Sequence, residues 1–469
     1  MILFLRRGRR AGWRCDADAM RNTTSKSTSS TAPATKHISR HKPRGSFLLR
    51  SLALPVAAVM GAGAFMLHSP NAAIAAPPEP TESASTSASA SASPSASPSP
   101  SASETGASAE SAEKARITAT AQGLVDAGFP AALAAVTKAD GSTVGVAVGK
   151  GNLETGEAPP LDGEVRIGSN TKTFVAVVIL QLVQEGKITL DEPIETYLPG
   201  LLHGEGIDGS KITVRQLLQH TSGLPEYTDT VPGETDIFQI RDNYYSTRDL
   251  LDVALSHPAL FEPGSQFKYT NTNYLVLSLL AEKVTHRPLA EQITQRIVEP
   301  LGLSHTYYPG PGEEDIRGTH PHGYHRNTPT EDWKDITRMD PSWGGGAGAM
   351  ISTPSELNKF FQATFDGTLL SQDSIAEMKK TVDTGGTHGN GYGLGLINYP
   401  LSCGGTAWGH GGTIHGYQTY DAVGPDGAAV TIAVTALPQT FVADLHDTAA
   451  SQEKNQLGLK AVDSLLCNR

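Results

Sequence analysis

The stretch RIGSNTKTFVAVVILQLVQEG, residues 166–186, joins a short polar start to a long apolar run. Apolar side chains recur at helical spacing from Phe174 onward, and Gly186 follows as a stop signal, so the stretch predicts a buried helix. Ser169 and Lys172 lie three residues apart, on one face of its first turn. A serine hydroxyl becomes a good nucleophile when a neighbouring base takes its proton, and burial favours the neutral amine that such a base requires.

The Ser-x-x-Lys pattern occurs several times in the chain, so the spacing alone does not identify a nucleophile. Ser111 begins one copy at the edge of a Ser/Ala-rich segment, and Ser451 begins another on a polar helical stretch. Both are interpreted as ordinary surface positions. The copy at Ser169 opens a long apolar helix, and Gly168 before it permits close backbone approach. Backbone N–H groups at a helix N-terminus also suit a developing oxyanion.

Two short polar segments downstream are further candidates for the same site. Tyr269–Asn271 places a tyrosine and an amide on the same side of an extended chain, where they could move a proton and hold a substrate carbonyl. His410–Thr413 has the sequence His-Gly-Gly-Thr before an expected strand edge, and its glycines would let a ligand approach the backbone or pair with it. The ordinary alternatives are a helix-capping loop for the first segment and a glycine-rich turn for the second.

Strand patterns lie near both ends of the globular part, and helical patterns lie between them. Two short strands flank Asp140–Gly141, and two more flank Pro425–Gly427 as a hairpin. Helices are expected in TVRQLLQH, TNYLVLSLLAEKV, TPSELNKFFQAT and residues 441–466. This order predicts an α+β fold, in which an antiparallel sheet built from both termini carries flanking helices and a helical insertion.

The first 76 residues have the layout of an export signal. Residues 1–50 hold twelve Lys and Arg against two Asp, and an apolar run at 51–67 and small residues at 73–75 follow in the order of a cleavable signal. A retained membrane anchor is the alternative, and the long basic region indicates a possible start downstream of Met1. The formal net charge is −11, so the rest of the chain is strongly acidic, which argues against nucleic acid and anionic membranes as partners.

Residues 77–114 form a Ser/Ala/Pro-rich segment that contains no large apolar side chain up to residue 112. Such a composition cannot offset the entropy of ordering, so an extended linker is expected, with reach from a membrane or wall layer as its purpose. The expected catalytic domain, residues 115–467, contains Cys403 and Cys467. An oxidising destination predicts one disulfide between them, and two free buried thiols are the alternative.

Taken in order, Ser-x-x-Lys, Tyr-x-Asn and His-Gly-Gly resemble the motifs of the serine penicillin-recognising enzymes. This family includes class C β-lactamases and secreted D-alanyl-D-alanine carboxypeptidases. Similar stretches cover nearly all of residues 118–467, among them LQLVQEGKITLDEPIETYLPGL, ITVRQLLQHTSGL, DPSWGGGAGAMISTPSEL, GYGLGL and WGHGGTIHGYQTY. The resemblance is greatest to the secreted carboxypeptidases, including the cysteine pair. It implies a β-lactamase/transpeptidase-like fold.

The resemblance implies catalytic roles for four side chains. Ser169 would attack the substrate carbonyl, and Lys172 would accept the proton of its hydroxyl. Tyr269 would relay a proton to the leaving amine. His410 stands where relatives carry lysine or histidine, and it would support Tyr269 electrostatically.

The resemblance also implies which groups hold the substrate. Asn271 would bind the amide of the acyl side chain, and Trp343 would form an aromatic wall of the cleft. The backbone N–H groups of Ser169 and Thr413 would make the oxyanion hole, with Gly412 beside them in the substrate-binding segment. No metal and no cofactor are expected.

The first expectation for function is an exported or envelope-associated, monomeric D-alanyl-D-alanine carboxypeptidase that penicillin-type β-lactams acylate. Two departures bear on it. The carboxypeptidases have threonine directly after the histidine, where this chain has Gly411, and an arginine just after GYGLGL, where it has Ile397 and Asn398. Both family residues help to hold a terminal carboxylate, and isoleucine does not replace a bidentate arginine.

Several alternatives therefore stay open. An esterase or amidase, a β-lactamase, or a penicillin-binding sensor without turnover would use the same scaffold. A different hydrolase class is disfavoured, because the sequence has no Gly-x-Ser-x-Gly elbow and no His-Glu-x-x-His zinc motif among its fifteen histidines.

Overall fold

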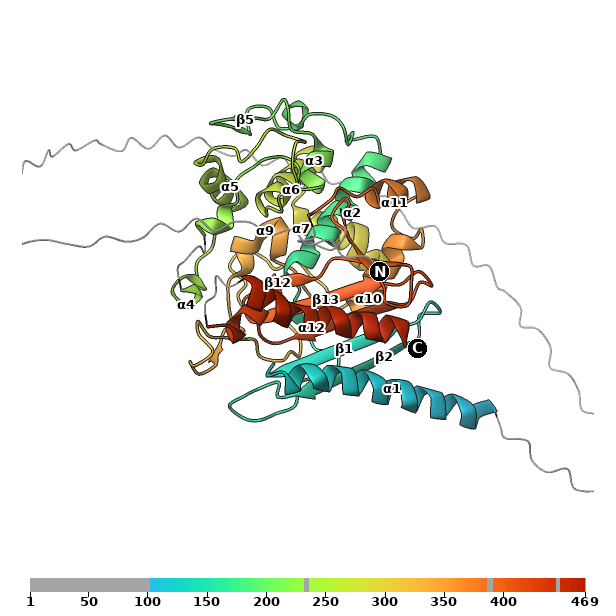
Figure 1. The fold of residues 1–469 in the computed structure, drawn as a ribbon. Coiled ribbons are helices and arrows are strands. Elements are labelled where there is room, and N and C mark those ends of the chain that lie inside the picture. The colour runs from blue at the N-terminus through green and yellow to red at the C-terminus, as the bar shows by residue number, and fades with distance from the viewer. Residues whose placement is uncertain (1–101, 232–235, 386–390, 444–447, 469) are drawn as a thin grey trace, which may run out of the picture. The chain divides into compact units, whose positions relative to one another are not determined.

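An antiparallel sheet of eight strands forms the centre of the computed structural model, which describes residues 102–231, 236–385, 391–443 and 448–468 (Figure 1). Its order is β2 (Thr143–Gly149), β1 (Ala131–Thr137), β14 (Ala429–Val434), β13 (Tyr417–Val423), β11 (Thr406–Gly409), β10 (Ile397–Pro400) and β9 (Gly391–Tyr392), with β12 (Gly412–Ile414) beside β13. The N-terminal strand β1 pairs with the C-terminal strand β14, from Ala132 opposite Val434 to Thr137 opposite Ala429. The predicted sheet built from both ends of the domain is thereby confirmed.

The segment between β2 and β9 is the predicted helical insertion. Its helices are α2 (Thr171–Gln184), α3 (Val214–Leu218), α4 (Ile237–Ile240), α5 (Thr247–Leu255), α6 (Thr272–Thr285), α7 (Leu289–Ile293), α8 (Glu299–Leu301), α9 (Gly345–Gly348), α10 (Pro354–Phe365) and α11 (Gln372–Met378). Three two-stranded pairs accompany them, β3 (Val165–Arg166) with β8 (Ile351–Ser352), β4 (His203–Gly204) with β5 (Ile207–Asp208), and β6 (Tyr324–His325) with β7 (Lys334–Asp335). The α+β layout is confirmed.

Local sequence explains where several elements begin and turn. The chain turns between β1 and β2 through a hydrogen bond from Lys138 N to Ser142 O at 2.9 Å. The turn between β13 and β14 is closed by Gly424 N donating to Ala428 O at 2.8 Å. Helix α10 starts at the predicted cap, where the Thr353 hydroxyl accepts from the backbone N–H of Glu356.

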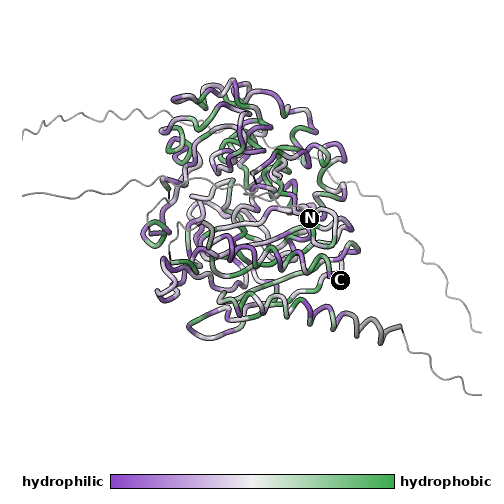
Figure 2. Tube along the Cα trace, viewed as in Figure 1, coloured by the Kyte–Doolittle hydropathy of each residue, from purple (hydrophilic) through white to green (hydrophobic). Residues whose placement is uncertain are grey.

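The two faces of the sheet are covered by different helices. Helix α10 packs on one face, and α1 (Ala102–Asp126) and α12 (Thr448–Cys467) pack on the other (Figure 1). Because both faces are covered, every residue of β1, β13 and β14 is buried, including the small alanines. Figure 2 shows hydrophobic residues along these strands and hydrophilic residues mainly along the peripheral loops.

The expectation of an extended linker was wrong for residues 102–114, which belong to the helix α1. Alanine and glutamate have high helix propensity, and the part of α1 that follows packs on the sheet through Ile117, Ala121 and Leu124. Packing of that apolar face stabilises a helix that composition alone would not have indicated. The rest of the linker, residues 77–101, and the export signal at 1–76 lie outside the described residues.

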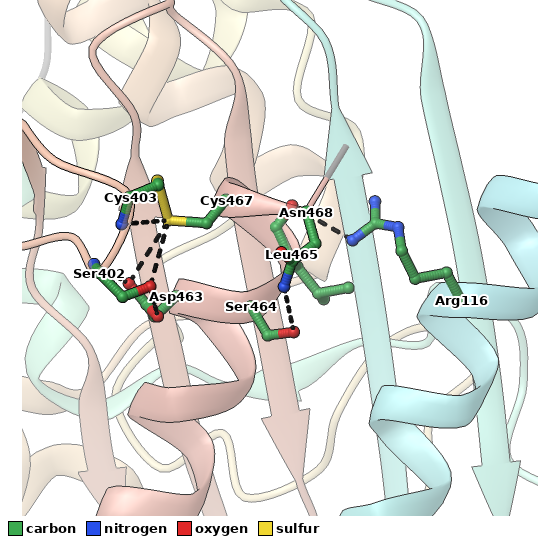
Figure 3. The surroundings of a disulfide bond; sticks show 8 residues. All are labelled: Arg116, Ser402, Cys403, Asp463, Ser464, Leu465, Cys467 and Asn468. Atoms are coloured by element: carbon green, nitrogen blue, oxygen red, sulfur yellow. Dashed lines mark hydrogen bonds between the residues drawn. A yellow bond between two sulfur atoms is a disulfide. The ribbon is translucent and has the colours of Figure 1, made fainter.

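Cys403 and Cys467 form a disulfide that joins the β10–β11 hairpin to the end of α12 (Figure 3). Two hydrogen bonds from Ser402 to the carboxylate of Asp463, at 2.8 and 2.6 Å, lie beside it. Arg116 of α1 donates to the carbonyl of Leu465 at 3.4 Å, so the two terminal helices also contact each other there. In the part of the chain that is described, no helix has the length and apolar composition needed to cross a bilayer.

Reduction of this disulfide should destabilise the domain. The bridge closes a loop with a sequence separation of 64, and the loop entropy that it removes from the unfolded chain corresponds to about 4 kcal/mol. The melting temperature should fall by several degrees when a reductant is added, as measured by calorimetry. The double variant Cys403→Ser/Cys467→Ser should melt like the reduced protein and ignore the reductant. Identical melting curves with and without reductant would show that the bridge contributes nothing.

Candidate active site

The candidate nucleophile sits in a tight turn that leads directly into α2. Residues Gly168–Asn170 form a single 3₁₀ turn, and α2 begins at Thr171. Gly168 has a φ of +48°, and a Cβ placed there would lie 2.7 Å from Thr413 N, so only glycine allows this approach to β12. Ser169 is half-buried and lines a cavity of about 1150 Å³.

The Lys172 amine is fully buried beside Ser169. Its Nζ lies 3.1 Å from Ser169 Oγ, 2.7 Å from Asn271 Oδ1 and 2.7 Å from the carbonyl oxygen of Ala347. The amide and main-chain oxygens can only accept, so they take two N–H bonds of the amine. The remaining position faces the serine hydroxyl, where the lone pair of a neutral amine would accept the Ser169 proton.

Burial sets the protonation of both candidate proton carriers. Removal from water lowers the pKa of Lys172 to about 7, although the negative charge of Glu226 acts in the opposite direction. Burial raises the pKa of Tyr269 well above 10, against the effect of its hydrogen bond with Ser169. Near neutral pH the amine can therefore act as a base, while the phenol keeps its proton and can donate it.

Glu226 orients Asn271, although no sequence motif marks Glu226 as a residue of the site. The Glu226 Oε2 accepts from the backbone N–H of Asn271 at 2.6 Å and from its Nδ2 at 3.3 Å, while Oε1 accepts from Thr228 N at 3.0 Å. Because the Asn271 Nδ2 faces a carboxylate, its Oδ1 must face Lys172. The second N–H of that amide is then free to serve the predicted role toward a substrate carbonyl.

His410 contacts a second tyrosine that the sequence did not indicate. Its Nδ1 donates to the carbonyl of Gly411 at 2.7 Å, so its Nε2 is an acceptor, and Tyr392 Oη donates to it at 2.8 Å. The His410 and Tyr269 ring centroids are 6.2 Å apart. His410 therefore lies at the site between Tyr392 and Tyr269.

The structure brings all the predicted site residues to one cavity apart from Lys172, which lies just beneath its surface. The cavity lining includes Ser169, Tyr269, Asn271, Trp343, His410, Gly411, Gly412 and Thr413. Trp343 is largely buried, and Tyr227 Oη donates to its carbonyl oxygen at 2.6 Å, which holds this wall in place. Cys403 and Cys467 do not line the cavity, although their neighbours Ser402 and Leu466 do.

Comparisons with known proteins agree with this geometry. A family model described as Beta-lactamase matches residues 116–455. A D-stereospecific amidohydrolase from Streptomyces sp. is 33% identical, with a TM-score of 0.66 over 76% of this chain and 99% of that chain. The D-amino acid amidase from Ochrobactrum anthropi SV3, solved with L-phenylalanine amide, is 26% identical, with a TM-score of 0.63 over 75% and 99% of the two chains.

Curated relatives match over shorter stretches. The protein PbpX from Bacillus subtilis (strain 168) is 29% identical over 229 residues, which are 48% of this chain and 52% of PbpX. Alignments with such relatives span between 27% and 52% of their lengths. The family match covers well over half of the chain, so the chain belongs to the β-lactamase family. It is a serine hydrolase of that family, as the order of its motifs indicated.

Removal of the Ser169 hydroxyl should abolish acylation. Ser169→Ala lacks the hydroxyl that faces Lys172, so the mass increase that an acylating ester, amide or penicillin gives the wild type should be absent, as measured by intact-protein mass spectrometry. Ser111→Ala is a matched control, because Ser111 heads another Ser-x-x-Lys pattern and is exposed on α1. Acylation of Ser169→Ala at the normal rate would remove this serine as the nucleophile.

The acid limb of the pH–rate profile should follow the loss of the proton from the Lys172 amine. Because the base is the neutral form, kcat/KM for acylation should rise about tenfold per pH unit up to a pKa of about 7 and then level off. Glu226→Gln keeps an acceptor for Asn271 and removes the charge that raises the pKa of Lys172, so the limb should move to lower pH. Glu262→Gln, an exposed matched change, should leave the profile in place. A shift of the acid limb to higher pH in Glu226→Gln would contradict this assignment.

Proposed function

We propose that the protein is an exported serine amidohydrolase that cleaves D-configured aminoacyl or peptidyl amides with uncharged leaving groups, through an acyl-enzyme on Ser169. The observation that carries this proposal is Ile397 in the cleft, at the place where family members that hold a terminal carboxylate have an arginine. Export is proposed from the basic, apolar and small-residue order of the first 76 residues.

The cleft offers little to a carboxylate. Ile397 is 5% exposed and lines the cavity, as does Gly411, which has no side chain. Of the described residues that line the cavity, none is an arginine and the one lysine is Lys460 of α12. An anionic group placed beside Ile397 would lose hydration without gaining a charged partner, which is unfavourable. A neutral amide or amine has no such requirement.

The proposed reaction uses each positioned group once. Lys172 takes the proton of Ser169 as its Oγ attacks the amide carbonyl, and the N–H groups of Ser169 and Thr413 receive the oxyanion. Tyr269 passes a proton to the nitrogen of the leaving group, and the C–N bond breaks. Water or another amine then releases the acyl group. Similarity to proteins named for D-stereospecific amide hydrolysis supports the D configuration.

A D-alanyl-D-alanine carboxypeptidase is the second candidate. It is favoured by the order and surroundings of the motifs at Ser169, Tyr269 and His410, and penicillin-type β-lactams would be its acylating inhibitors. A β-lactamase would have to bind the carboxylate of its substrate, so Ile397 weighs against that activity in the same way.

One assay separates these functions. The exported protein is incubated with D-phenylalanine amide, L-phenylalanine amide, a diacyl-D-Ala-D-Ala peptide and penicillin, and acyl-enzyme and products are followed by mass spectrometry. Release of ammonia and D-phenylalanine, with little release from the L enantiomer, supports the amidohydrolase. Steady release of D-alanine from the peptide, without amide hydrolysis, would replace it with the carboxypeptidase. A stable penicilloyl adduct without turnover of any substrate would indicate a sensor.

An arginine at position 397 should shift the substrate preference toward peptides with a free terminal carboxylate. Ile397→Arg would offer a guanidinium to a terminal carboxylate, and a hydrogen bond to a charged group contributes about 1.5–3 kcal/mol. The ratio of kcat/KM for a D-Ala-terminated peptide with a free carboxylate to that for its C-terminal amide should rise about tenfold or more. Ile397→Met, which is similar in size and uncharged, should leave the ratio unchanged. An unchanged ratio in Ile397→Arg would show that position 397 does not face the leaving group.

A further inference from the structure

The strand segment that carries the predicted oxyanion donor is interrupted in the middle of its pairing. Trp408 of β11 pairs with Val423 of β13, and Gly412 of β12 pairs with Thr419. The register is the same on both sides of residues 409–411, so β11 and β12 are two parts of one strand. In this register, Asp421 lies opposite the interruption.

The Asp421 carboxylate takes the place of the missing main-chain acceptors. Its Oδ1 accepts from the backbone N–H of His410, and its Oδ2 accepts from that of Gly411, both at 3.1 Å. Oδ2 also accepts from the side-chain amide of Asn170 at 2.7 Å. Asn170 directly follows Ser169, and its Nδ2 also donates to Thr419 Oγ1 at 2.9 Å. One buried carboxylate therefore joins the interrupted strand to the turn of the nucleophile.

This arrangement explains why the residue after His410 is glycine. Gly411 has a φ of +84°, which turns two consecutive N–H groups toward one anion, and a Cβ there would lie 3.0 Å from the carbonyl oxygen of Thr419. A threonine would be strained in this conformation. Because the backbone binds Asp421 in this conformation, position 411 is a glycine and carries no hydroxyl. The chain therefore lacks one group that could hold a substrate carboxylate.

Stability does not account for a carboxylate at this position. Asp421 is 4% exposed, and its three donors are all uncharged groups. Burial raises its pKa to about 6, although the hydrogen bonds from His410, Asn170 and Gly411 act to lower it. The other titratable groups nearby are the His410 ring and Tyr399, whose hydroxyl donates to the carbonyl of His410. A buried charge without a cationic partner costs stability, so another role is required to explain it.

We propose that Asp421 is a positioning residue for the oxyanion hole, because its carboxylate holds the segment His410–Thr413 in register with the turn of Ser169 through Asn170. The proposal rests on the serine chemistry proposed above. Without the carboxylate, the donor at Thr413 would no longer be held at a fixed place relative to the nucleophile. Complete loss of one such donor lowers kcat by about 10²–10³, so partial displacement should cost less.

The test is Asp421→Asn, assayed with p-nitrophenyl acetate. The amide keeps the size of the carboxylate, but its NH₂ group meets N–H donors, so at least one of the three hydrogen bonds is lost. The kcat for acylation should fall about tenfold or more, while KM stays within about threefold. The melting temperature should change by only a few degrees, because removal of the buried charge offsets the lost hydrogen bond. Asp426→Asn, an exposed change in the β13–β14 turn, should alter none of these values.

The pH profile provides a readout that a merely structural role would not change. In the wild type, Asp421 also takes up a proton below about pH 6, so log(kcat/KM) should fall there more steeply than the slope of one that Lys172 alone gives, with an extra loss of about one log unit in total. In Asp421→Asn the slope should be one. If Asp421→Asn does not fold, Asn170→Ala cuts the same connection from the other side and should lower kcat with KM little changed.

The outcomes distinguish this inference from the proposed function. The wild type is compared with folded Asp421→Asn and Asn170→Ala for its p-nitrophenol burst and pH slope. If a variant gives the same burst with the same slope, the role of Asp421 is overturned and the serine chemistry stays intact. No p-nitrophenol release by the wild type beyond that given by Ser169→Ala would overturn the proposed chemistry and this inference with it.

Discussion

The catalytic geometry depends on a contact between two backbones. Gly168, before the nucleophile, lies against Thr413, and a Cβ on Gly412 would lie 1.8 Å from the carbonyl oxygen of Ile167, so no side chain fits between them. The helical insertion and the sheet therefore meet without side chains at the point where the oxyanion is expected. Side chains farther along the cleft, such as Ile397, can then change without moving the reacting groups, which suits a family whose members act on different substrates.

Two carboxylates act on this centre in different ways. Burial lowers the pKa of Lys172, and Glu226 raises it. The resulting value of about 7 leaves a large share of the amine uncharged at physiological pH. Asp421 lies on the other side of the nucleophile and binds main-chain donors. Both groups carry negative charge close to Ser169, which agrees with the proposed preference for a substrate whose leaving-group side is uncharged.

The sequence predicted what is encoded locally. The apolar period after Ser169 predicted α2, and the strand patterns around Asp140–Gly141 and Pro425–Gly427 predicted the strands β1, β2, β13 and β14. The motifs predicted which side chains would meet, since their order resembles that of a known family. Glu226 and Asp421 were missed because their partners are distant in sequence and no short pattern marks them. The start of α1 was missed because Ser and Ala dominate there, and its stabilising contacts come from the sheet.

The disulfide has a consequence for resistance to proteases. Cys403 and Cys467 enclose in sequence the strands β11 to β14, and with them the segment His410–Thr413. A single backbone cut between these two residues would leave both fragments covalently joined, and the hydrogen bonds of Ser402 with Asp463 would still hold the closing ends together. A nicked molecule could therefore keep its oxyanion strand paired in the sheet, which would prolong its working life in surroundings rich in peptidases.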